Sequence, residues 1–399
     1  MDPAFTPTPR HTLPPHVSFV IPIVAGIGNA LMAVPMVRQL KRAIPTSRVT
    51  ILARIEPMAE VFRRVAEVDE VLVTGKGWRG QWRNVTWARQ RKVDYYVVPF
   101  PSNRWQYSML AATSGAKRRI LHSYPIGYWR ALHFLPSTRV PSKRGIHDVV
   151  QNLNLLHALG IEPDLTEVPT FHVTETDRAR ADELLHPGGA ELQRRPAPLS
   201  PPAQPAPNDA FIAVHAGSAR TILARAKRWP PHNYARLIDA ISREFQLPIV
   251  LLEGPDEAGV AHEIQLHLPK DAVPIAVVPL RGPLGDAAAV LQRATLYVGS
   301  DSGLAHLAAA VGTRTVTLFG PADPDRVCPF GQRDLVVQSP TNCGPCFLYP
   351  WTTPYPKIRC REPYCIDGIT VESAMEAVRR GMKMGSGPTG SPVTLRMSS

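Results

Sequence analysis

The residues best suited to chemistry lie at 299–306, where the sequence GSDSGLAH connects an apolar run to a stretch of small residues. Asp and Ser are helix-capping residue types, and a glycine lets a ligand approach the backbone closely. The N–H groups at the start of such a helix lack partners within it, and they attract anions. Asp301, Ser302 and Gly303 therefore predict a loop that binds a diphosphate, although an ordinary capped helix would use the same residues.

Two more polar stretches follow apolar runs upstream of this loop. The sequence HAGS at 215–218 ends one run and leads to KRWP at 227–230, whose Lys227 would either reach a phosphate or stay solvated. The sequence EGPDE at 253–257 ends the next run, and a carboxylate at the end of a strand suits the hydroxyl pair of a ribose. Because parallel sheets bind ligands at the carboxyl ends of their strands, all three stretches indicate one binding edge.

The elements that must position these residues alternate between strands and helices. In the first half, continuous apolar runs predict buried strands at 17–23, 48–53, 69–73 and 93–98. In the second half, similar runs predict strands at 210–215, 248–252, 275–278, 295–299 and 314–319. Helical patterns separate them, among them apolar residues at helical spacing over 145–160 that predict one helix. We therefore predict an α/β fold of two Rossmann-like, doubly wound domains that face a central cleft.

Residues 17–37 form a long apolar stretch that resembles a membrane-spanning helix. Pro22, Gly26, Gly28 and Asn29 interrupt it, which favours a strand, a tight glycine turn and then a helix. No secretory signal peptide is expected either, because the first residues lack an apolar core. We therefore expect a cytoplasmic protein.

Length and proline content divide the chain into segments. Its 399 residues suffice for two domains, and 42 of them are proline, about twice the usual share of roughly 5%. Prolines concentrate near the N-terminus and again at 187–207, which indicates unstructured or connecting chain. We predict a disordered leader at 1–15, a first domain at 16–186, a Pro-rich linker at 187–208, a second domain at 209–382 and a flexible tail at 383–399.

Positive charge is concentrated in the first domain. The chain carries a net charge of +12, and residues 1–150 contain 22 Lys and Arg against 8 Asp and Glu. This excess indicates an anionic partner, although the second domain and the lack of a known nucleic-acid-binding pattern argue against nucleic acid. Residues 76–92 combine six basic residues with three tryptophans, which is typical of membrane interfaces and equally of an amphipathic helix packed on a sheet. We expect an anionic membrane surface or a phosphorylated lipid as the partner.

Four of the five cysteines lie close together in the segment 340–366. Cys343 and Cys346 form a CxxC pair, and Cys360 and Cys365 follow within reach. This spacing is typical of a tetrahedral thiolate site for zinc or iron, and four thiolates would leave no open position for catalysis. The sequence therefore predicts a structural metal site, with four reduced thiols packed as small apolar groups as the alternative.

Along the chain, the glycine turn at 26–29 is followed by HAGS and KRWP, then EGPDE, then GSDSGLAH and finally LFGPADP at 318–324. Motifs in this order resemble glycosyltransferase family 9, the bacterial heptosyltransferases, over about residues 17–375. The resemblance implies a GT-B fold, with an acceptor-binding N-terminal domain and a C-terminal domain that binds a nucleotide sugar, typically ADP-heptose. It implies transfer with inversion, without a catalytic metal or other cofactor, to a lipopolysaccharide-type or other anionic glycan at the inner face of the bacterial inner membrane. It also implies donor contacts at His215, Gly217, Ser218, Lys227, Glu257, Asp301, Ser302, Gly303 and His306.

The glycine turn at 26–29 departs from the family pattern, in which an aspartate taken as the general base follows the second glycine. Here that position holds Asn29, whose amide cannot accept a proton at neutral pH. We therefore expect a transferase whose catalytic candidates are Asn29, Lys227 and Asp301. Replacements for the base in the first domain would be Asp94, His122 and Asp148. The alternative is a non-catalytic GT-B module that binds a nucleotide sugar or glycan.

Overall fold

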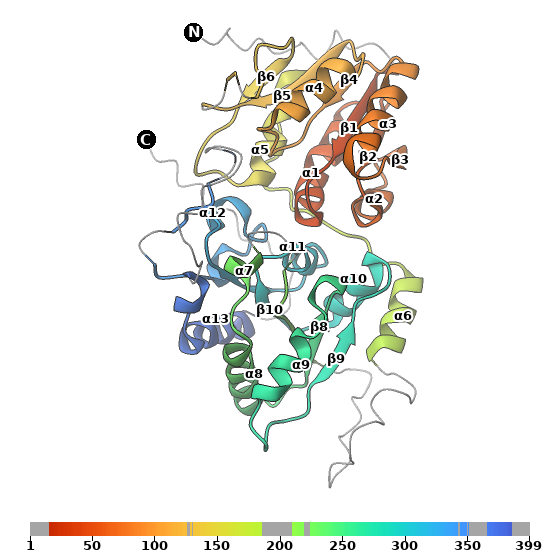
Figure 1. Cartoon of the computed structure of the whole chain (residues 1–399). Coiled ribbons are helices and arrows are strands. Elements are labelled where there is room, and N and C mark those ends of the chain that lie inside the picture. The colour runs from red at the N-terminus through yellow and green to blue at the C-terminus, as the bar shows by residue number, and fades with distance from the viewer. Residues whose placement is uncertain are drawn as a thin grey trace.

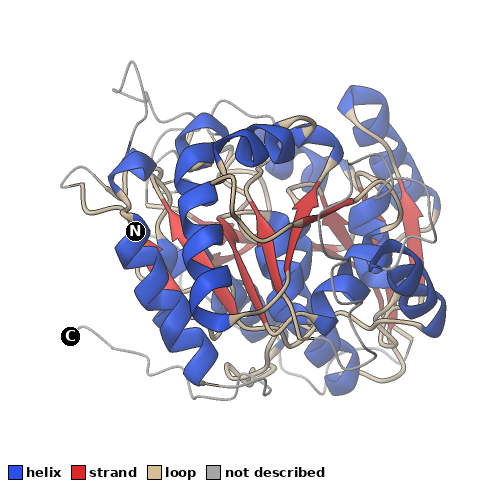
Figure 2. Cartoon of the chain, turned by 90° about the horizontal axis from the view of Figure 1, so that it is seen from below, coloured by secondary structure: helices blue, strands red, loops and turns tan. Residues whose placement is uncertain are grey.

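The computed structural model describes residues 16–125, 128–129, 131–185, 210–218, 224–341, 344–348, 350 and 365–384. Its strands form two six-stranded sheets, one in each half of the chain (Figure 1). All neighbouring strands in both sheets run parallel. Helices cover the strands on both sides, as a view turned by 90° shows (Figure 2). The predicted α/β fold with two doubly wound domains is confirmed.

The two sheets share one topology. The first has the order β3-β2-β1-β4-β5-β6 and the second the order β12-β11-β10-β7-β8-β9, which is the same order read from the other edge. It is the arrangement of dinucleotide-binding folds, in which ligands meet the carboxyl ends of the strands. The strands are β1 (Ser18–Ile23), β2 (Arg48–Ala53), β3 (Glu70–Val73), β4 (Tyr95–Val97), β5 (Arg118–Ser123), β6 (Thr138–Pro141), β7 (Ile212–His215), β8 (Ile249–Glu253), β9 (Ala276–Pro279), β10 (Leu296–Ser300), β11 (Thr315–Phe319) and β12 (Val336–Gln338).

Helices connect these strands. In the first half they are α1 (Ile27–Ala43), α2 (Glu56–Arg63), α3 (Gly77–Gln90), α4 (Trp105–Thr113), α5 (Asp148–Asn154) and α6 (Glu175–Leu185). In the second half they are α7 (Ala224–Lys227), α8 (Pro231–Phe245), α9 (Val260–His267), α10 (Leu284–Arg293), α11 (Gly303–Ala310), α12 (Pro324–Val327) and α13 (Val371–Lys383). Each helix that directly follows a strand begins at the carboxyl edge of its sheet, so the starts of these helices face the region where ligands bind.

The apolar stretch at 17–37 is β1 followed by α1. Five of the six residues of β1 are buried, because a central parallel strand is covered on both faces. Helix α1 is buried along most of its length as well, since it packs against α5 in its own half and α11 in the other. Within the described part of the chain, no helix is both long and apolar enough to span a membrane.

Three strands and one helix differ from the sequence prediction. Strands β5, β6 and β12 were not predicted, because none of them contains a long run of apolar residues, as in the sequence RRILHS of β5. Residues 145–160 were predicted as one helix, but the α-helix ends at Asn154 and a 3-10 helix, Leu155–Leu159, completes the segment. The apolar spacing in this region reflects burial of both pieces and does not require one continuous helix.

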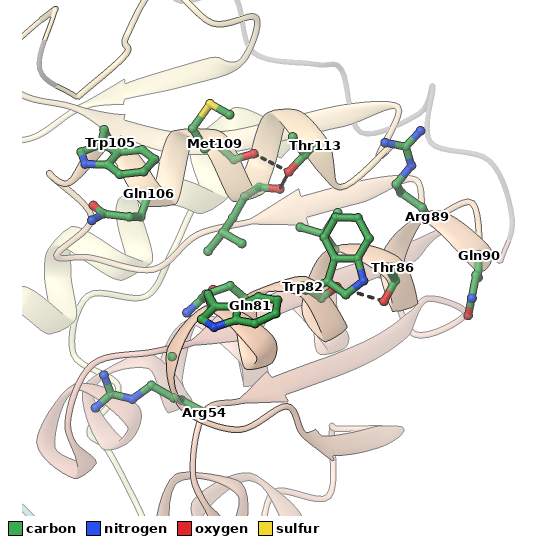
Figure 3. A pocket seen from close by; sticks show the side chains of 14 residues that line it. Arg54, Gln81, Trp82, Thr86, Arg89, Gln90, Trp105, Gln106, Met109 and Thr113 are labelled. Atoms are coloured by element: carbon green, nitrogen blue, oxygen red, sulfur yellow. Dashed lines mark hydrogen bonds between the residues drawn. The ribbon is translucent and has the colours of Figure 1, made fainter.

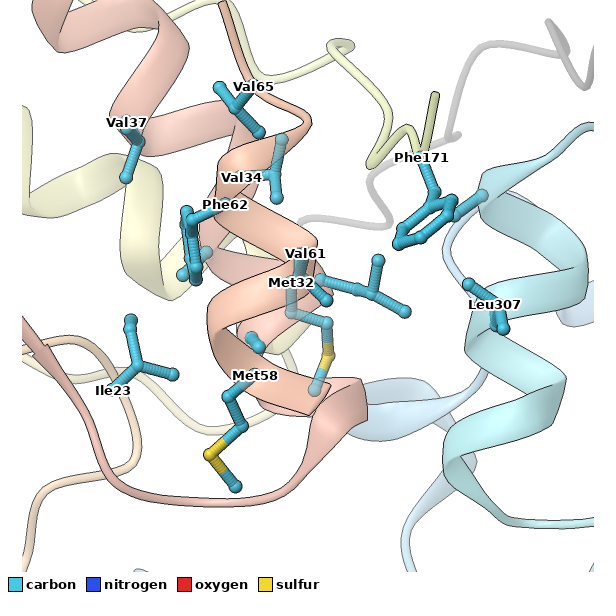
Figure 4. Packing of buried hydrophobic residues seen from close by; sticks show 14 of the residues in the cluster. Ile23, Met32, Val34, Val37, Met58, Val61, Phe62, Val65, Phe171 and Leu307 are labelled. Carbon is cyan, nitrogen blue, oxygen red and sulfur yellow. The ribbon is translucent and has the colours of Figure 1, made fainter. Parts of the chain in front are cut away.

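An apolar core crosses from one half of the chain to the other. Met32 of α1, Phe171 and Leu307 of α11 belong to one cluster of buried side chains, part of which Figure 4 shows. Because this cluster includes residues from both sheets' helices, separating the halves would expose apolar surface to water. The two halves are therefore held in a defined orientation around the edge where ligands bind.

A polar junction reinforces this apolar contact. Glu60 of α2 accepts hydrogen bonds from the backbone N–H groups of Leu284 and Gly285, at 2.7 and 2.8 Å, and so caps the start of α10. Arg64 bonds Asp177 of α6, with 3.1 Å between Nη2 and Oδ1. Helix α6 falls within the predicted first domain, yet it packs along α10.

The predicted domain boundaries remain a proposal. The predicted leader at 1–15 and linker at 187–208 lie outside the described residues, as does the predicted tail apart from residues 383–384.

Candidate active site between the two sheets

The predicted phosphate loop joins β10 to α11. Ser302 occupies the N-cap position of α11, but its hydroxyl makes no capping hydrogen bond. Instead, Ser302 Oγ lies 3.4 Å from both Nδ1 of His215 and the hydroxyl of Tyr297. Because the Ser302 hydroxyl does not bond to them, the first N–H groups of α11 are not capped by this side chain. This geometry suits an anionic ligand.

A lysine and an aspartate meet beside this loop. Lys227 Nζ donates to Asp301 Oδ2 at 2.5 Å, although the two residues are far apart in the sequence. Asp301 is 7% exposed, whereas the Lys227 side chain is 22% exposed. Because the buried carboxylate holds the ammonium group from one side, the lysine is positioned while still reachable from solvent.

His215 and Glu257 form a buried pair at the ends of β7 and β8. His215 Nε2 donates to Glu257 Oε2 at 2.7 Å, and the N–H of Gly254 donates to the same oxygen at 3.1 Å. Burial raises the pKa of Glu257, but the hydrogen bond and charge of His215 outweigh it and hold the pKa below its usual value. A Cβ atom on Gly217 would lie 1.8 Å from the Glu257 carboxyl carbon, so only glycine fits there. Ser218 follows and is buried.

The glycine turn of the first sheet lies directly against α11. A Cβ atom on Gly28 would lie 2.6 Å from Cδ2 of His306, and one on Gly303 would lie 3.3 Å from Cβ of Ile27. The starts of α1 and α11 therefore meet across the two halves, and the contact at Gly28 leaves no room for a Cβ atom. Asn29, directly after Gly28, is half-buried at this junction.

His306 faces the glycine turn as a neutral side chain. Burial lowers its pKa to about 4, so the imidazole is uncharged at neutral pH. Its ring makes no hydrogen bond within the described part of the chain. A neutral imidazole retains a lone pair, so His306 has the chemistry of a proton acceptor at the point where the two halves meet.

The other base candidates in the first domain are occupied or enclosed. Asp94 accepts from the backbone N–H and hydroxyl of Ser18 and from Lys117, at the amino end of β4. His122 is fully buried in β5, and burial lowers its pKa to about 4. Asp148 is fully buried and uses both carboxylate oxygens in bonds to Arg326.

The pair of Arg326 and Asp148 was not anticipated from sequence. Arg326 of α12 donates through Nε and Nη2 to the two oxygens of Asp148, at 2.8 and 2.9 Å, and both residues are buried. Beside this pair, His147 bonds the backbone oxygen of Cys328 at 2.7 Å. These contacts join α5 to the loop that contains LFGPADP. The only sequence signal was a charged residue soon after that motif, which does not identify a partner 178 positions away.

Two of the four clustered cysteines can be placed. The N–H of Cys346 donates to the backbone oxygen of Pro321, and Cys365 Sγ would lie 3.4 Å from a Cβ on Gly320. Both thiols thus belong to residues packed on the turn after β11, whereas Cys343 and Cys360 lie outside the described residues. Among the residues that the structure describes, no group of three or more potential ligands is in position to hold a metal. Cys328 is buried, which raises the pKa of its thiol to about 12.

The structure brings the predicted donor residues of the second half to one edge. His215 links Glu257 to Ser302, and Lys227 is linked to Asp301, which precedes Ser302. Gly303 and His306 extend this group to the glycine turn of the first half. The positions fit the roles expected for them, while their contacts with a donor stay a prediction.

Comparison with known proteins identifies relatives of this arrangement. The family model for glycosyltransferase family 9 (heptosyltransferase) matches residues 105–354. Lipopolysaccharide heptosyltransferase 3 of Escherichia coli K12 is 24% identical over 304 residues, which cover 74% of this chain and 80% of that protein. A glycosyl transferase family 9 structure from Veillonella parvula has a TM-score of 0.72 at 19% identity, covering 92% of this chain and 98% of that one. The E. coli ADP-heptose lps heptosyltransferase II has a TM-score of 0.66 at 17% identity, covering 92% and 99%.

Proposed function

The chain belongs to glycosyltransferase family 9 (heptosyltransferase), and from this we propose that it transfers heptose from ADP-heptose to a lipopolysaccharide-type or other anionic glycan. As a member of this family it is a glycosyltransferase with the GT-B fold, which favours transfer over a non-catalytic binding module. The observation that carries the proposal is the meeting of α1 and α11, because it joins an anion-binding helix start to the half of the molecule with excess positive charge.

The donor would lie along the carboxyl edge of the second sheet. The N–H groups at the start of α11 and the ammonium of Lys227 suit the two phosphates, since both present positive charge to one place. Both hydrogen bonds to the Glu257 carboxylate from the described residues end on Oε2. Its other oxygen is therefore suited to accept from the ribose hydroxyls. His215 and Gly217 would shape this part of the site by holding the carboxylate in place.

The reaction would be a direct displacement with inversion. An acceptor hydroxyl attacks the anomeric carbon, the bond from that carbon to the diphosphate oxygen breaks, and ADP leaves with the electron pair. Lys227 and the N–H groups at Ser302 and Gly303 would stabilise the charge that develops on the leaving diphosphate. No catalytic metal is required in this scheme because fixed positive groups already face the phosphates. Asp301 would keep Lys227 in position.

The proton of the acceptor hydroxyl would pass to His306. Asn29 cannot accept it, but its amide can orient the hydroxyl by a hydrogen bond. Nε2 of His306 would lie 3.1 Å from a Cβ on Gly28, so the neutral imidazole stands beside the turn that carries Asn29. This assignment moves the base from the first half of the molecule to the second.

The decisive experiment is a transfer assay that follows ADP release with ADP-heptose and a lipopolysaccharide precursor as acceptor. We expect Lys227→Ala to lower kcat/KM by about 10²–10³-fold, the usual loss for one group that stabilises developing negative charge. Lys270→Ala is the matched control, because Lys270 is exposed and follows the far end of α9. Binding of UDP or GDP in preference to ADP would retain the transferase and contradict the heptose donor.

The cysteine cluster would hold a structural zinc or iron. Cys346 and Cys365 pack on the same turn, which fits a shared site that Cys343 and Cys360 would complete. We expect about one metal per chain by elemental analysis, and loss of that metal in Cys346→Ser. In this variant, we expect activity to fall only in proportion to the fraction of folded protein, because the metal takes no part in the chemical step. Metal-free protein of full stability would contradict the site.

The expected place of action is the inner face of the bacterial inner membrane. The positive charge of the first half would attract a surface of anionic lipid that carries the acceptor. Such binding weakens as salt concentration rises, because the attraction is electrostatic. Sedimentation with phosphatidylglycerol vesicles at low and high salt tests this expectation.

A further inference from the structure

An apolar groove runs between α3 and α4 on the outer side of the first half. Its volume is about 1010 Å³, and Trp78, Trp82, Val85, Trp105, Met109 and Leu110 form much of its lining (Figure 3). This volume reaches the upper end of the range for small-molecule sites, about 300–1,000 Å³. The space is therefore large enough for a ligand with a long apolar part.

The tryptophans of this groove are unusually open to solvent. Trp78 is 75% exposed, Trp82 66% and Trp105 52%, although indole rings are normally packed against other groups. Large exposed apolar patches on soluble proteins mark places where another molecule binds. The predicted alternative, an amphipathic helix that buries its tryptophans on the sheet, fails for Trp78 and Trp82, while Trp87 does pack on that side.

One end of the groove opens at the edge where the reaction would occur. Arg54 directly follows β2, Trp78 lies in the first turn of α3, and Trp105 is the first residue of α4. These positions are at the carboxyl ends of their strands, as is the glycine turn after β1. The groove then follows both helices away from that edge toward Arg89 and Thr113.

Unpaired polar atoms and positive charge accompany the apolar lining. Among the described residues, buried Nε of Arg54 and buried Oε1 of Gln81 have no hydrogen-bond partner, and both side chains line the groove. Helix α3 adds Arg79, Arg83 and Arg89 without a single carboxylate. A ligand that is apolar along its length and anionic at its head would match the apolar lining and accept a hydrogen bond from Arg54, whereas the Gln81 oxygen would need a donor such as a hydroxyl group.

We propose that this groove binds a fatty acyl chain of the lipid-linked acceptor, with the anionic head held near Arg54 at the cleft. The proposal rests on the proposed function, since it assigns the acceptor as a glycolipid bound together with its chain. A surface that binds the membrane as a whole needs only an exposed apolar and basic face, without a groove. An elongated groove that begins at the catalytic edge, in contrast, aligns one chain so that its polar head reaches the glycine turn.

Direct binding tests the groove independently of catalysis. The full-length protein is titrated with 11-(dansylamino)undecanoic acid, a fluorescent fatty acid, and we expect saturable binding. Trp82→Ala should weaken it at least about fivefold, because the substitution removes apolar contact area from the groove wall. Trp129→Ala is the matched control, since Trp129 is 75% exposed but does not line the groove. No saturable binding, or equal losses in both variants, would overturn the proposal.

Kinetics then identify the source of the chain. With the acylated acceptor, Trp82→Ala should raise KM about tenfold and leave kcat unchanged, whereas KM for the same acceptor after alkaline deacylation should not change. Equal KM changes for both acceptors would overturn the acyl-chain assignment. Failure of both acceptors as substrates in the wild type, with fatty-acid binding intact, would contradict the proposed function and not the groove.

Two other occupants would give different results. If bulk lipid occupied the groove, Trp82→Ala would reduce binding to phosphatidylglycerol vesicles without changing the ratio of the two KM values, and the proposal would fall. If a second copy of the chain occupied the groove, sedimentation would show a dimer. Both the Trp82→Ala substitution and added fatty acid would then dissociate this dimer. That result would also overturn the proposal.

Discussion

The two sheets share one strand order, but their carboxyl edges differ in how charge is arranged. At the second edge, Lys227 is bonded to Asp301 and His215 to Glu257. At the first edge, Asn29 is neutral and Arg54 Nε has no partner among the described residues. The second edge thus holds these charges in fixed pairs before any ligand arrives, whereas the first edge presents one guanidinium nitrogen without a hydrogen-bond partner among the described residues, next to exposed tryptophans. One topology can therefore accommodate both the proposed diphosphate site and the proposed glycolipid site, because the difference lies in the side chains that follow the strands.

The largest expected effect is a loss of stability when a contact between the two halves is removed. Arg326→Ala leaves Asp148 buried without its partner, and we expect the free energy of unfolding to fall by about 3–5 kcal/mol. Urea denaturation followed by circular dichroism measures the loss. The double variant Arg326→Met with Asp148→Leu is the control, since replacing both charges by apolar groups should recover most of the stability. An unchanged midpoint in the single variant would show that the pair does not hold the halves together.

The second prediction tests which edge supplies the base. His306→Asn should lower kcat by about 10²-fold or more with a smaller change in KM, the loss expected for removal of a general base. Asn29→Asp should retain activity, because a carboxylate there can accept the proton in place of His306. Steady-state kinetics of both single variants and the double variant measure this. Full kcat in His306→Asn would place the base elsewhere.

The third prediction concerns the close approach of α1 to α11. Gly28→Ala introduces a methyl group 2.6 Å from the His306 ring, and we expect a loss of about 1–3 kcal/mol in stability together with lower activity. Gly26→Ala is a matched control in the same turn, because its nearest neighbour would be Asn29 Nδ2 at 4.0 Å. Thermal unfolding compares the two. Equal behaviour would mean that the junction can open without cost.

The smallest expected effect is a pH dependence of stability within the first half. Burial lowers the pKa of His122 to about 4, so the folded protein binds this proton less readily than the unfolded chain does. Stability should therefore decline as pH falls from about 6.5 toward 4, by about 1 kcal/mol at pH 6 for this group alone. Denaturation of His122→Asn at pH 8 and pH 6 should show a smaller decline than the wild type. Exposed His262→Asn serves as the control, and an equal decline in all three proteins would contradict the assignment.

The sequence determined the class of fold and the donor side of the site. Apolar runs identify β1, β2, β10 and β11, since strands buried on both faces are nearly continuous in apolar residues. The motifs at the ends of strands in the second half indicate His215, Lys227, Glu257 and Asp301 as site residues. A doubly wound fold places the residues that follow its strands at the edge where ligands bind. Strand β5 escaped prediction although it is as long as β1, because Arg118, Arg119 and His122 flank a short apolar centre.

Only the tertiary structure decided the contacts between the halves. Nothing in the sequence pairs Arg326 with Asp148, or sets Gly28 against His306, because these contacts depend on how two separately formed sheets are oriented. The same is true of the groove between α3 and α4: the sequence places tryptophans on a basic helix, but it does not say whether they face the sheet or solvent. Local sequence dictates burial along each strand or helix, whereas side chains that meet across 100 or more residues are selected by packing of the whole chain.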